Sequence, residues 1–253
     1  MTRRTFTTAL ATSVPIPTAT RRDVGNVKIH AAAVARIPLT AIATEYERAT
    51  GIAVTLLFDT AGAAEKRFLA DVEAAVLMTN IQLIRNAEGA GILRDGTSIL
   101  LGSTFAGIAV MPGSTKPDVS TPEKLKATLL AANCIAVSDP TRGATVGTHF
   151  MKVIAALGVT SEILPKVKFS RDGVETLRLV IDGIADLGVS QSSEIIQANR
   201  DALVGPFPHE FALTTAFAVW HRNDISSTAA ELVTRLTNPQ AREKFATDGI
   251  VPP

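Results

Sequence analysis

The feature that most constrains the fold is an alternation of short apolar runs with longer helical patterns, which continues through most of the chain. Residues 27–32, 52–58 and 75–78 have the length and apolar content of buried strands. Between the first two, apolar residues recur at helical spacing from Pro38 onward, and Gly51 marks the end of that helix. Strands that alternate with helices predict a parallel sheet covered by helices, so we expect an α/β protein.

A second unit of the same kind follows. Its expected strands are 105–110, 134–137, 167–169 and 185–189. Thr121 precedes a proline, which is typical of a helix N-terminus, and further helical patterns separate the later strands. After this unit the sequence predicts one long strand and two helices, at residues 212–220, 226–236 and 238–249. We expect the segment between the first and second units, which is rich in glycine, to form turns.

Charge and hydropathy exclude several classes of protein. Lys and Arg number 25 and Asp and Glu number 24, so the net charge is +1. Binders that depend on a strong overall charge, for nucleic acid or anionic membranes, are therefore disfavoured. The 46% of apolar residues excludes an intrinsically disordered chain. No apolar run reaches the length of about 18 residues expected of a membrane-spanning helix.

The cysteine and histidine content predicts neither a disulfide within the chain nor a metal centre. Cys134 is the single cysteine, and its apolar neighbours predict a small buried side chain. The four histidines lack the spacing of metal ligands. We therefore expect no metal and no cofactor.

Residues 1–25 differ from the rest of the chain. Arg3 and Arg4 precede a stretch of small residues that ends before Arg21 and Arg22. This pattern resembles a twin-arginine export signal, so we assign residues 1–25 to a signal-like or disordered segment outside the fold. It predicts an exported, periplasmic protein; a cytoplasmic location is the alternative.

Three loops that connect a strand to a helix, and one polar cluster after a strand, are candidates for a ligand site. Ligands of open parallel sheets bind beyond the carboxyl ends of the strands. The first-turn amides of a helix point outward and carry partial positive charge, so they attract anions. Small residues let an anion approach these amides, while hydroxyl groups and basic side chains add donors. The candidate ligand-binding residues are Ala33, Val34, Thr60, Ala61, Gly62, Lys66, Arg142, Gly143, Ala144, Thr145, Ser190 and Gln191.

The sequence resembles the periplasmic molybdate-binding protein family, within the type II solute-binding fold. The residues that carry the resemblance are 27–33, 58–63, 138–140, 203–208 and 236–241. The resemblance implies an α/β fold with two lobes and a ligand cleft between them. Lobe 1 would comprise residues 27–103 plus 205–253, and lobe 2 residues 104–204. Such lobes close around a ligand by hinge motion.

One stretch departs from the molybdate-binding pattern. Those proteins typically have a serine at the end of the first strand, whereas residues 31–35 here carry no hydroxyl group. The single tyrosine, Tyr46, falls on the first helix and is not expected in the cleft. The segments 138–147 and 188–191 are similar to a divergent branch of the family that includes aconitate isomerase. This resemblance implies a polycarboxylate ligand.

Three functions are compatible with these observations. In the first, the protein binds a small anion, an organic polycarboxylate, and delivers it as a monomer to an ABC permease. In the second, it is an isomerase that interconverts cis- and trans-aconitate, which needs an acid or base to move a proton; His149 and Glu194 are the candidates. In the third, it is a cytoplasmic ligand-sensing module.

Overall fold

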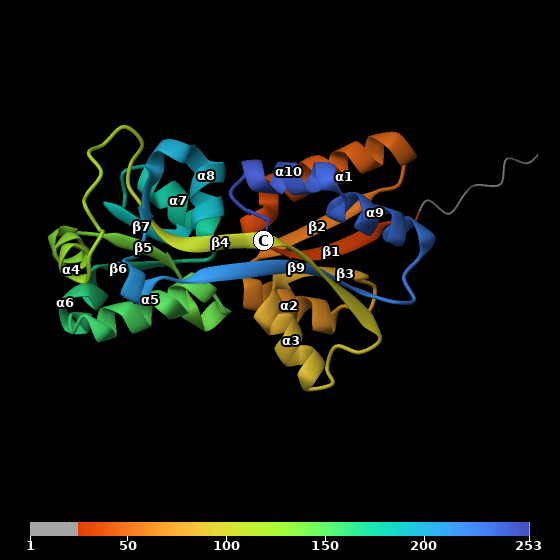
Figure 1. The fold of residues 1–253 in the computed structure, drawn as a ribbon, viewed down its shortest axis with the longest axis horizontal. Coiled ribbons are helices and arrows are strands. Elements are labelled where there is room, and N and C mark those ends of the chain that lie inside the picture. Colours follow the sequence, from red (N-terminus) through yellow and green to blue (C-terminus); the bar gives the residue numbers. More distant parts are fainter. Residues whose placement is uncertain (1–24, 253) are drawn as a thin grey trace, which may run out of the picture.

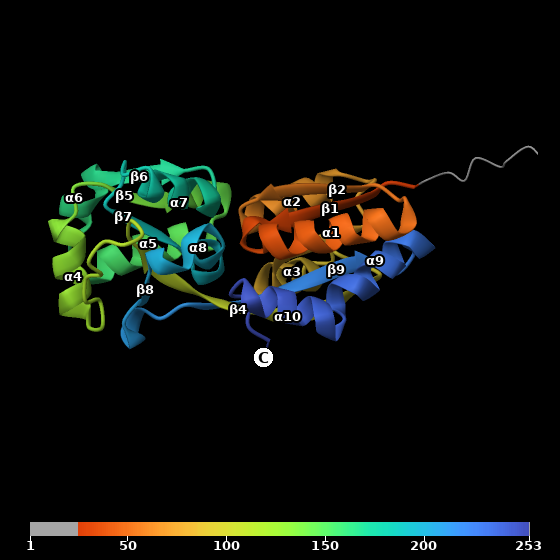
Figure 2. The ribbon, with the colours of Figure 1, turned by 90° about the horizontal axis from the view of Figure 1, so that it is seen from above.

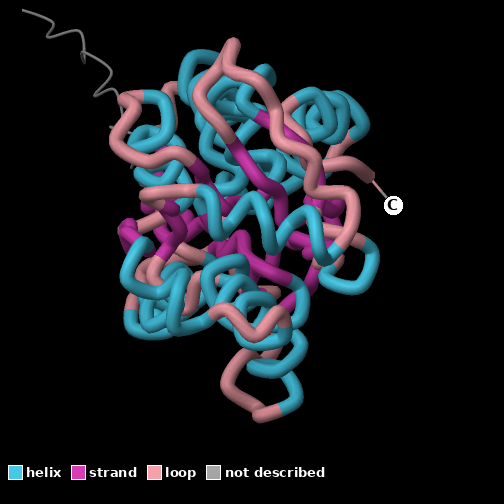
Figure 3. The backbone as a smooth tube through the Cα atoms, turned by 90° about the vertical axis from the view of Figure 1, so that its left-hand side faces the viewer, coloured by secondary structure: helices cyan, strands magenta, loops and turns pink. Residues whose placement is uncertain are grey.

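The computed structural model describes residues 25–252, which form two α/β lobes side by side (Figures 1 and 2). Helices lie outside the strands in both lobes, as the view from one end makes clear (Figure 3). The predicted α/β class and the two-lobed architecture are therefore confirmed. The signal-like segment predicted for residues 1–25 lies outside the described residues except for Gly25.

The first sheet has a parallel part and an antiparallel part. Strands β2 (Val54–Asp59), β1 (Val27–Ala32) and β3 (Val76–Asn80) are parallel and adjacent in that order. Strand β9 (Thr214–Arg222) runs antiparallel to β3. Strand β4 (Gly96–Ala109) then pairs with β9, also antiparallel. The three parallel strands end at the same edge of the sheet, which faces the other lobe (Figure 2).

Helices cover both faces of this sheet (Figure 1). One face carries α1 (Arg36–Thr50), α9 (Ser227–Thr237) and α10 (Pro239–Thr247). The other face carries α2 (Ala61–Ala70) and α3 (Ile81–Gly89).

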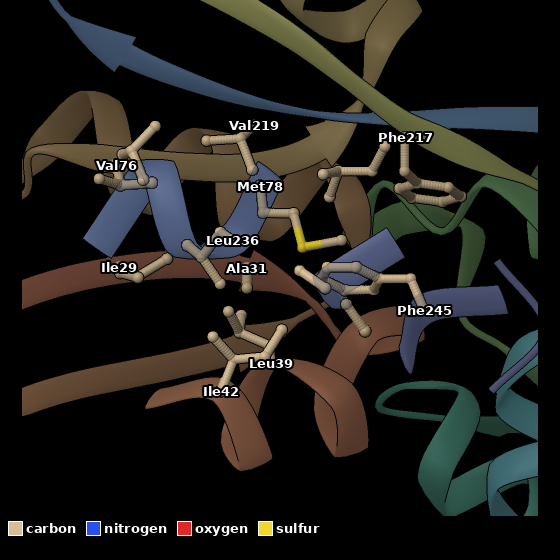
Figure 4. Packing of buried hydrophobic residues seen from close by; sticks show 14 of the residues in the cluster. Ile29, Ala31, Leu39, Ile42, Val76, Met78, Phe217, Val219, Leu236 and Phe245 are labelled. Carbon is tan, nitrogen blue, oxygen red and sulfur yellow. The ribbon is translucent and has the colours of Figure 1, made fainter. Parts of the chain in front are cut away.

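The main core of this lobe lies between the sheet and the first group of helices. Leu39, Leu236 and Phe245 from the helices pack against Ile29 and Met78 of the strands (Figure 4). All five side chains are almost completely buried. Burial of an apolar side chain contributes about 1.5–3 kcal/mol, so the apolar stripes of the helices hold this layer on the sheet.

The second sheet is built on a parallel set of three strands. Strand β5 (Ile135–Ser138) lies between β7 (Leu187–Gln191) and β6 (Val167–Ser170). The later part of β4 pairs antiparallel with β7, and β8 (Leu203–Pro206) pairs with β4.

Five helices and several single turns surround this second sheet. The helices are α4 (Pro122–Ala131), α5 (Thr145–Ala156), α6 (Thr160–Ile163), α7 (Gly173–Ile181) and α8 (Ser192–Asn199). Short 3-10 helices occur at η1 (Ala33–Ala35), η2 (Pro140–Arg142), η3 (Leu164–Lys166), η4 (Arg200–Ala202) and η5 (His209–Phe211).

The second core lies mainly between the sheet, α4 and α5. Val137 of β5 packs with Phe150 and Ile154 of α5, and each of these is fully buried. Cys134 is half-buried at the edge of a small cluster that includes Val180, so its predicted burial is only partial.

Strand β4 belongs to both sheets and passes from one lobe to the other (Figure 1). Near its middle, Ser103 exchanges two backbone hydrogen bonds with Val251, with N–O distances of 2.7 and 2.9 Å. The lobe boundaries at 103/104 and 204/205 stay predictions, and β4 and β8 run across them.

Several elements differ from the prediction. Strand β4 begins at Gly96 and not at residue 105, and the glycines in this segment allow close packing. A Cβ atom on Gly96 would lie 2.1 Å from the Trp220 ring, and one on Gly102 would lie 2.5 Å from the Val251 carbonyl oxygen. Helices α3, α6 and α8 were not predicted, and β8 was expected to be a connector.

No helix within residues 25–252 is long and apolar enough to span a membrane. In the same range, no group of three or more His, Cys, Asp or Glu side chains is arranged to hold a metal ion.

Candidate functional site

A small cavity lies between the lobes, where β1, β2, β5 and β7 end and the next helices begin. The space open to the centre of a water molecule is about 30 Å³. One water needs about 10–15 Å³ by this measure, so the cavity has room for about two or three water molecules. Its lining residues are Ala32, Ala33, Val34, Asp59, Thr60, Ala61, Ser138, Ala144, Thr145, Val146, Gly173, Ser190, Gln191 and Glu194.

Several helix N-termini meet at this cavity. Ala61 opens α2, Thr145 and Val146 open α5, and Gly173 opens α7. No side chain caps α5, and within the described range the amides of Thr145 and Val146 have no hydrogen-bond partner. Unpartnered first-turn amides carry partial positive charge, so this end of the cavity is suited to an anion.

Glu194 is the buried acid of the cavity. Its Oε2 accepts hydrogen bonds from Ser190 Oγ, at 2.6 Å, and from the Gln191 amide, at 3.3 Å. The carboxyl group packs against Gly173 so closely that a Cβ atom there would lie 2.0 Å from Oε2. Burial raises the pKa of Glu194 to about 7, although these hydrogen bonds lower it. Glu194 can therefore gain or lose a proton near neutral pH.

Asp59 also lines the cavity, but two arginines compensate its charge. Arg142 Nη2 from the other lobe lies 2.9 Å from Asp59 Oδ1 and 3.1 Å from Oδ2. Arg67 Nη2, from α2, lies 2.8 Å from Oδ2. Arg142 is thus a bridge between the lobes.

Further contacts hold the lobes together on both sides of the cavity. On the Arg142 side, the Gly62 amide donates to the Gly143 carbonyl oxygen at 3.1 Å, and Thr60 Oγ1 donates to the Arg142 carbonyl oxygen. On the other side, the Gln197 side chain accepts from the Ile37 amide at 3.1 Å and donates to the Val34 carbonyl oxygen. The lobes are therefore in a closed arrangement.

The family is decided by a family model described as "Bacterial extracellular solute-binding protein", which matches residues 27–251. The chain belongs to this family. The predicted relationship to type II solute-binding proteins is thereby confirmed, and the family description places its members outside the cytoplasm.

Individual relatives are distant in sequence. An aconitate isomerase from Pseudomonas sp is 23% identical, over 83% of this chain and 82% of that protein. The periplasmic molybdate-binding protein of Azotobacter vinelandii has a TM-score of 0.71 at 17% identity, covering 90% of this chain and 99% of that one. PEB3 of Campylobacter jejuni, solved with L-phospholactate, has a TM-score of 0.62 at 16% identity, covering 88% and 98%. At these identities the two solved structures bear on the fold alone.

Nine of the fourteen predicted site residues of this solute-binding protein line the cavity. They are Ala33, Val34, Thr60, Ala61, Ala144, Thr145, Ser190, Gln191 and Glu194. Four others line an outer groove beside Asp59, and these are Gly62, Lys66, Arg142 and Gly143. Arg142 in particular was expected to bind the ligand, whereas its guanidinium group holds Asp59 and the Arg171 carbonyl oxygen.

His149 lies away from the cavity. Its ring stacks on Phe207 with centroids 5.7 Å apart, and Nε2 lies 2.8 Å from the Phe211 carbonyl oxygen. His149 therefore does not line this cavity, and a catalytic role for it stays a prediction.

Five lining residues were not among the named ligand-binding candidates: Ala32, Asp59, Ser138, Val146 and Gly173. Three of them end a strand, and the other two lie in the first turn of a helix. The rule that placed the site at strand ends could have included all five. The role of Asp59, by contrast, depends on a partner 83 positions away.

Proposed function

We propose that this solute-binding protein binds a small organic anion with one or more carboxylate groups in the cavity between its lobes. The observation that carries the proposal is the meeting of helix N-termini at the cavity, above all the uncapped N-terminus of α5 with the free amides of Thr145 and Val146. Amides of this kind hold carboxylate oxygens without a basic side chain.

The relatives support an anionic ligand. The Azotobacter protein is named for molybdate, PEB3 was solved with L-phospholactate, and the Pseudomonas enzyme is named for aconitate. An anion-binding role for this chain agrees with all three.

The residues that line the cavity favour an organic anion over a metal oxyanion such as molybdate. Ala32, Ala33 and Val34 give the first-strand side of the cavity an apolar surface without a hydroxyl group. Tyr46 is buried in the core of its own lobe and donates to the Thr228 carbonyl oxygen, so it offers the cavity no hydroxyl either. The ligand would enter while the lobes stand further apart, and the lobes would then close around it by hinge motion.

A thermal-shift panel of molybdate, tungstate, sulfate, citrate and trans-aconitate tests this function. A ligand at 100 times its Kd stabilises the protein by about 2.7 kcal/mol, and the melting temperature should rise by about 5–10 °C. We expect the organic acids to give the larger shifts. A strongest shift with molybdate would contradict the carboxylate class, and no shift with any anion would contradict anion binding.

We further propose that the protein is exported and that, as a monomer, it delivers its bound anion to an ABC permease. The extracellular character of the family supports this role. Export is tested by sequencing the N-terminus of protein from a periplasmic extract, where cleavage near residue 25 is expected. An intact N-terminus confined to the cytoplasm would contradict it and favour a sensing module.

A second candidate function is the interconversion of cis- and trans-aconitate. Two observations favour it: the aconitate isomerase relative and the carboxyl group of Glu194, which titrates near neutral pH inside the cavity. Moving the double bond needs a group that takes a proton from one carbon and returns it to another. Conversion of either isomer, followed by ultraviolet absorbance, should be lost in Glu194→Gln. Absence of conversion by the wild-type protein would rule the isomerase out.

A further inference from the structure

We propose that the cavity binds its anion together with one proton, carried by Glu194, so that this residue determines both the pH range of binding and the kind of anion accepted. The inference rests on the proposed anion-binding function. It assigns Glu194 a part in recognition that neither the family nor the relatives' names provide.

The charges around the cavity lead to this inference. No lysine or arginine is among the lining residues, while two carboxyl groups are. Asp59 is neutralised by Arg142 and Arg67. Glu194 has no ion-pair partner among residues 25–252. An anion bound beside an ionised Glu194 would meet an uncompensated negative charge in a site with little water.

No lysine or arginine of the neighbouring elements pairs with Glu194 among residues 25–252. Asp172, at the N-terminus of α7, raises the pKa of Glu194, although Arg36 and Arg171 pair with Asp172 at 3.9 and 3.4 Å. Arg36, at the start of α1, lowers the pKa of Glu194, and both effects are smaller than that of burial. Arg200 and Asp201 belong to η4, at the opposite end of α8. Burial therefore dominates, and the neutral form of Glu194 is the one that suits an anion.

The hydrogen bonds of Glu194 leave one oxygen for the ligand. Oε2 already accepts from Ser190 Oγ and the Gln191 amide. Oε1 has no hydrogen-bond partner in the described part of the chain, and Glu194 lines the cavity. A proton on Oε1 would be donated to the ligand, so this position suits a ligand oxygen that accepts a hydrogen bond, as in an ionised carboxylate.

Anion binding and protonation of Glu194 are linked, and each favours the other. A bound anion favours the protonated form of Glu194, so binding takes up a proton wherever the free protein has lost it. Affinity is then greatest below the pKa of about 7 and falls as pH rises through and above it. The apparent Kd is proportional to 1 + 10^(pH − pKa). Relative to its value at low pH, the apparent Kd is therefore about 2 times higher at pH 7 and about 100 times higher at pH 9.

The test is a calorimetric titration of the full chain with trans-aconitate and, separately, with sulfate between pH 7 and pH 9, where neither probe has a proton to lose. We expect Kd to rise about 50-fold across this range in the wild-type protein. Titration at pH 8 in buffers with different ionisation heats should show uptake of about one proton. In Glu194→Gln the amide donates like the neutral acid, so Kd should stay nearly constant.

Glu231→Gln is the matched control, because it removes one exposed carboxylate from α9, which does not line the cavity. It should keep the wild-type pH dependence. Wild-type binding that is constant with pH would overturn the inference and leave the proposed function standing, as would an undiminished pH dependence in Glu194→Gln. Absence of binding by both proteins at every pH, with both probes, would overturn the proposed function itself. If Glu194→Gln does not fold, the wild-type series and the proton count decide.

Discussion

Gly62→Val is expected to weaken anion binding at least about 100-fold while the protein still folds. Gly62 lies in the first turn of α2 and meets Gly143 of the other lobe backbone to backbone. A Cβ atom at Gly62 would lie 2.9 Å from the Gly143 Cα and 3.1 Å from the Gly143 carbonyl oxygen, and these backbone atoms cannot turn aside. Holding the binding-competent closed form below about 1% of molecules raises the apparent Kd by the same factor.

Calorimetric titration with trans-aconitate measures this loss, and small-angle scattering should show a larger radius for the variant in the presence of the anion. Gly89→Val is the control, since Gly89 ends α3 and a Cβ atom there meets nothing within 4 Å. Wild-type affinity in Gly62→Val would mean that closure at this contact is not needed for binding.

Arg142→Ala should weaken anion binding by about 100-fold, although Arg142 does not line the cavity. The substitution removes the only contact of Asp59 with the other lobe among the described side chains and leaves Arg67, which is 55% exposed, as its partner. The Arg142–Asp59 pair is partly buried, since Arg142 is 35% and Asp59 4% exposed, so its loss costs less than the about 3–5 kcal/mol of a fully buried pair. A loss of about 2.8 kcal/mol corresponds to 100-fold in affinity. The substitution should lower the population of the closed form and leave the negative charge of Asp59 less compensated.

The double variant Asp59→Asn, Arg142→Ala separates these two effects. If the exposed charge of Asp59 repels the anion, the double variant should recover part of the affinity lost in Arg142→Ala. Arg178→Ala provides a control in the same lobe, because Arg178 is 71% exposed and pairs with its helical neighbour Asp182. Equal affinity in Arg142→Ala and Arg178→Ala would contradict the bridging role.

Local sequence patterns predicted much of the fold, because a strand or a helix start is often specified by a few consecutive residues. The apolar run at 27–32 is β1, and the threonine–proline start at 121 is the N-terminus of α4. Helix α8 lacked such a signal. Its N-cap is Gln191, an uncommon capping residue, and its first turn contains a buried polar group, Glu194.

The site was only partly predictable for a related reason. Residues at the ends of parallel strands gather at one edge, so Thr60, Thr145 and Ser190 could be placed together. The partner of Arg142 could not be found in this way. A basic residue in a loop resembles a ligand contact until the fold brings Asp59 to it from another strand.

Strand β4 connects the two lobes without a loop between them. Its residues 96–105 pair with β9 in one sheet, and its residues 106–109 pair with β7 in the other. The exchange between Ser103 and Val251 reinforces the strand near the middle of its length. Both lobes line the small cavity, so an anion that binds there stabilises the folded form of both, and unfolding of either lobe removes the binding site.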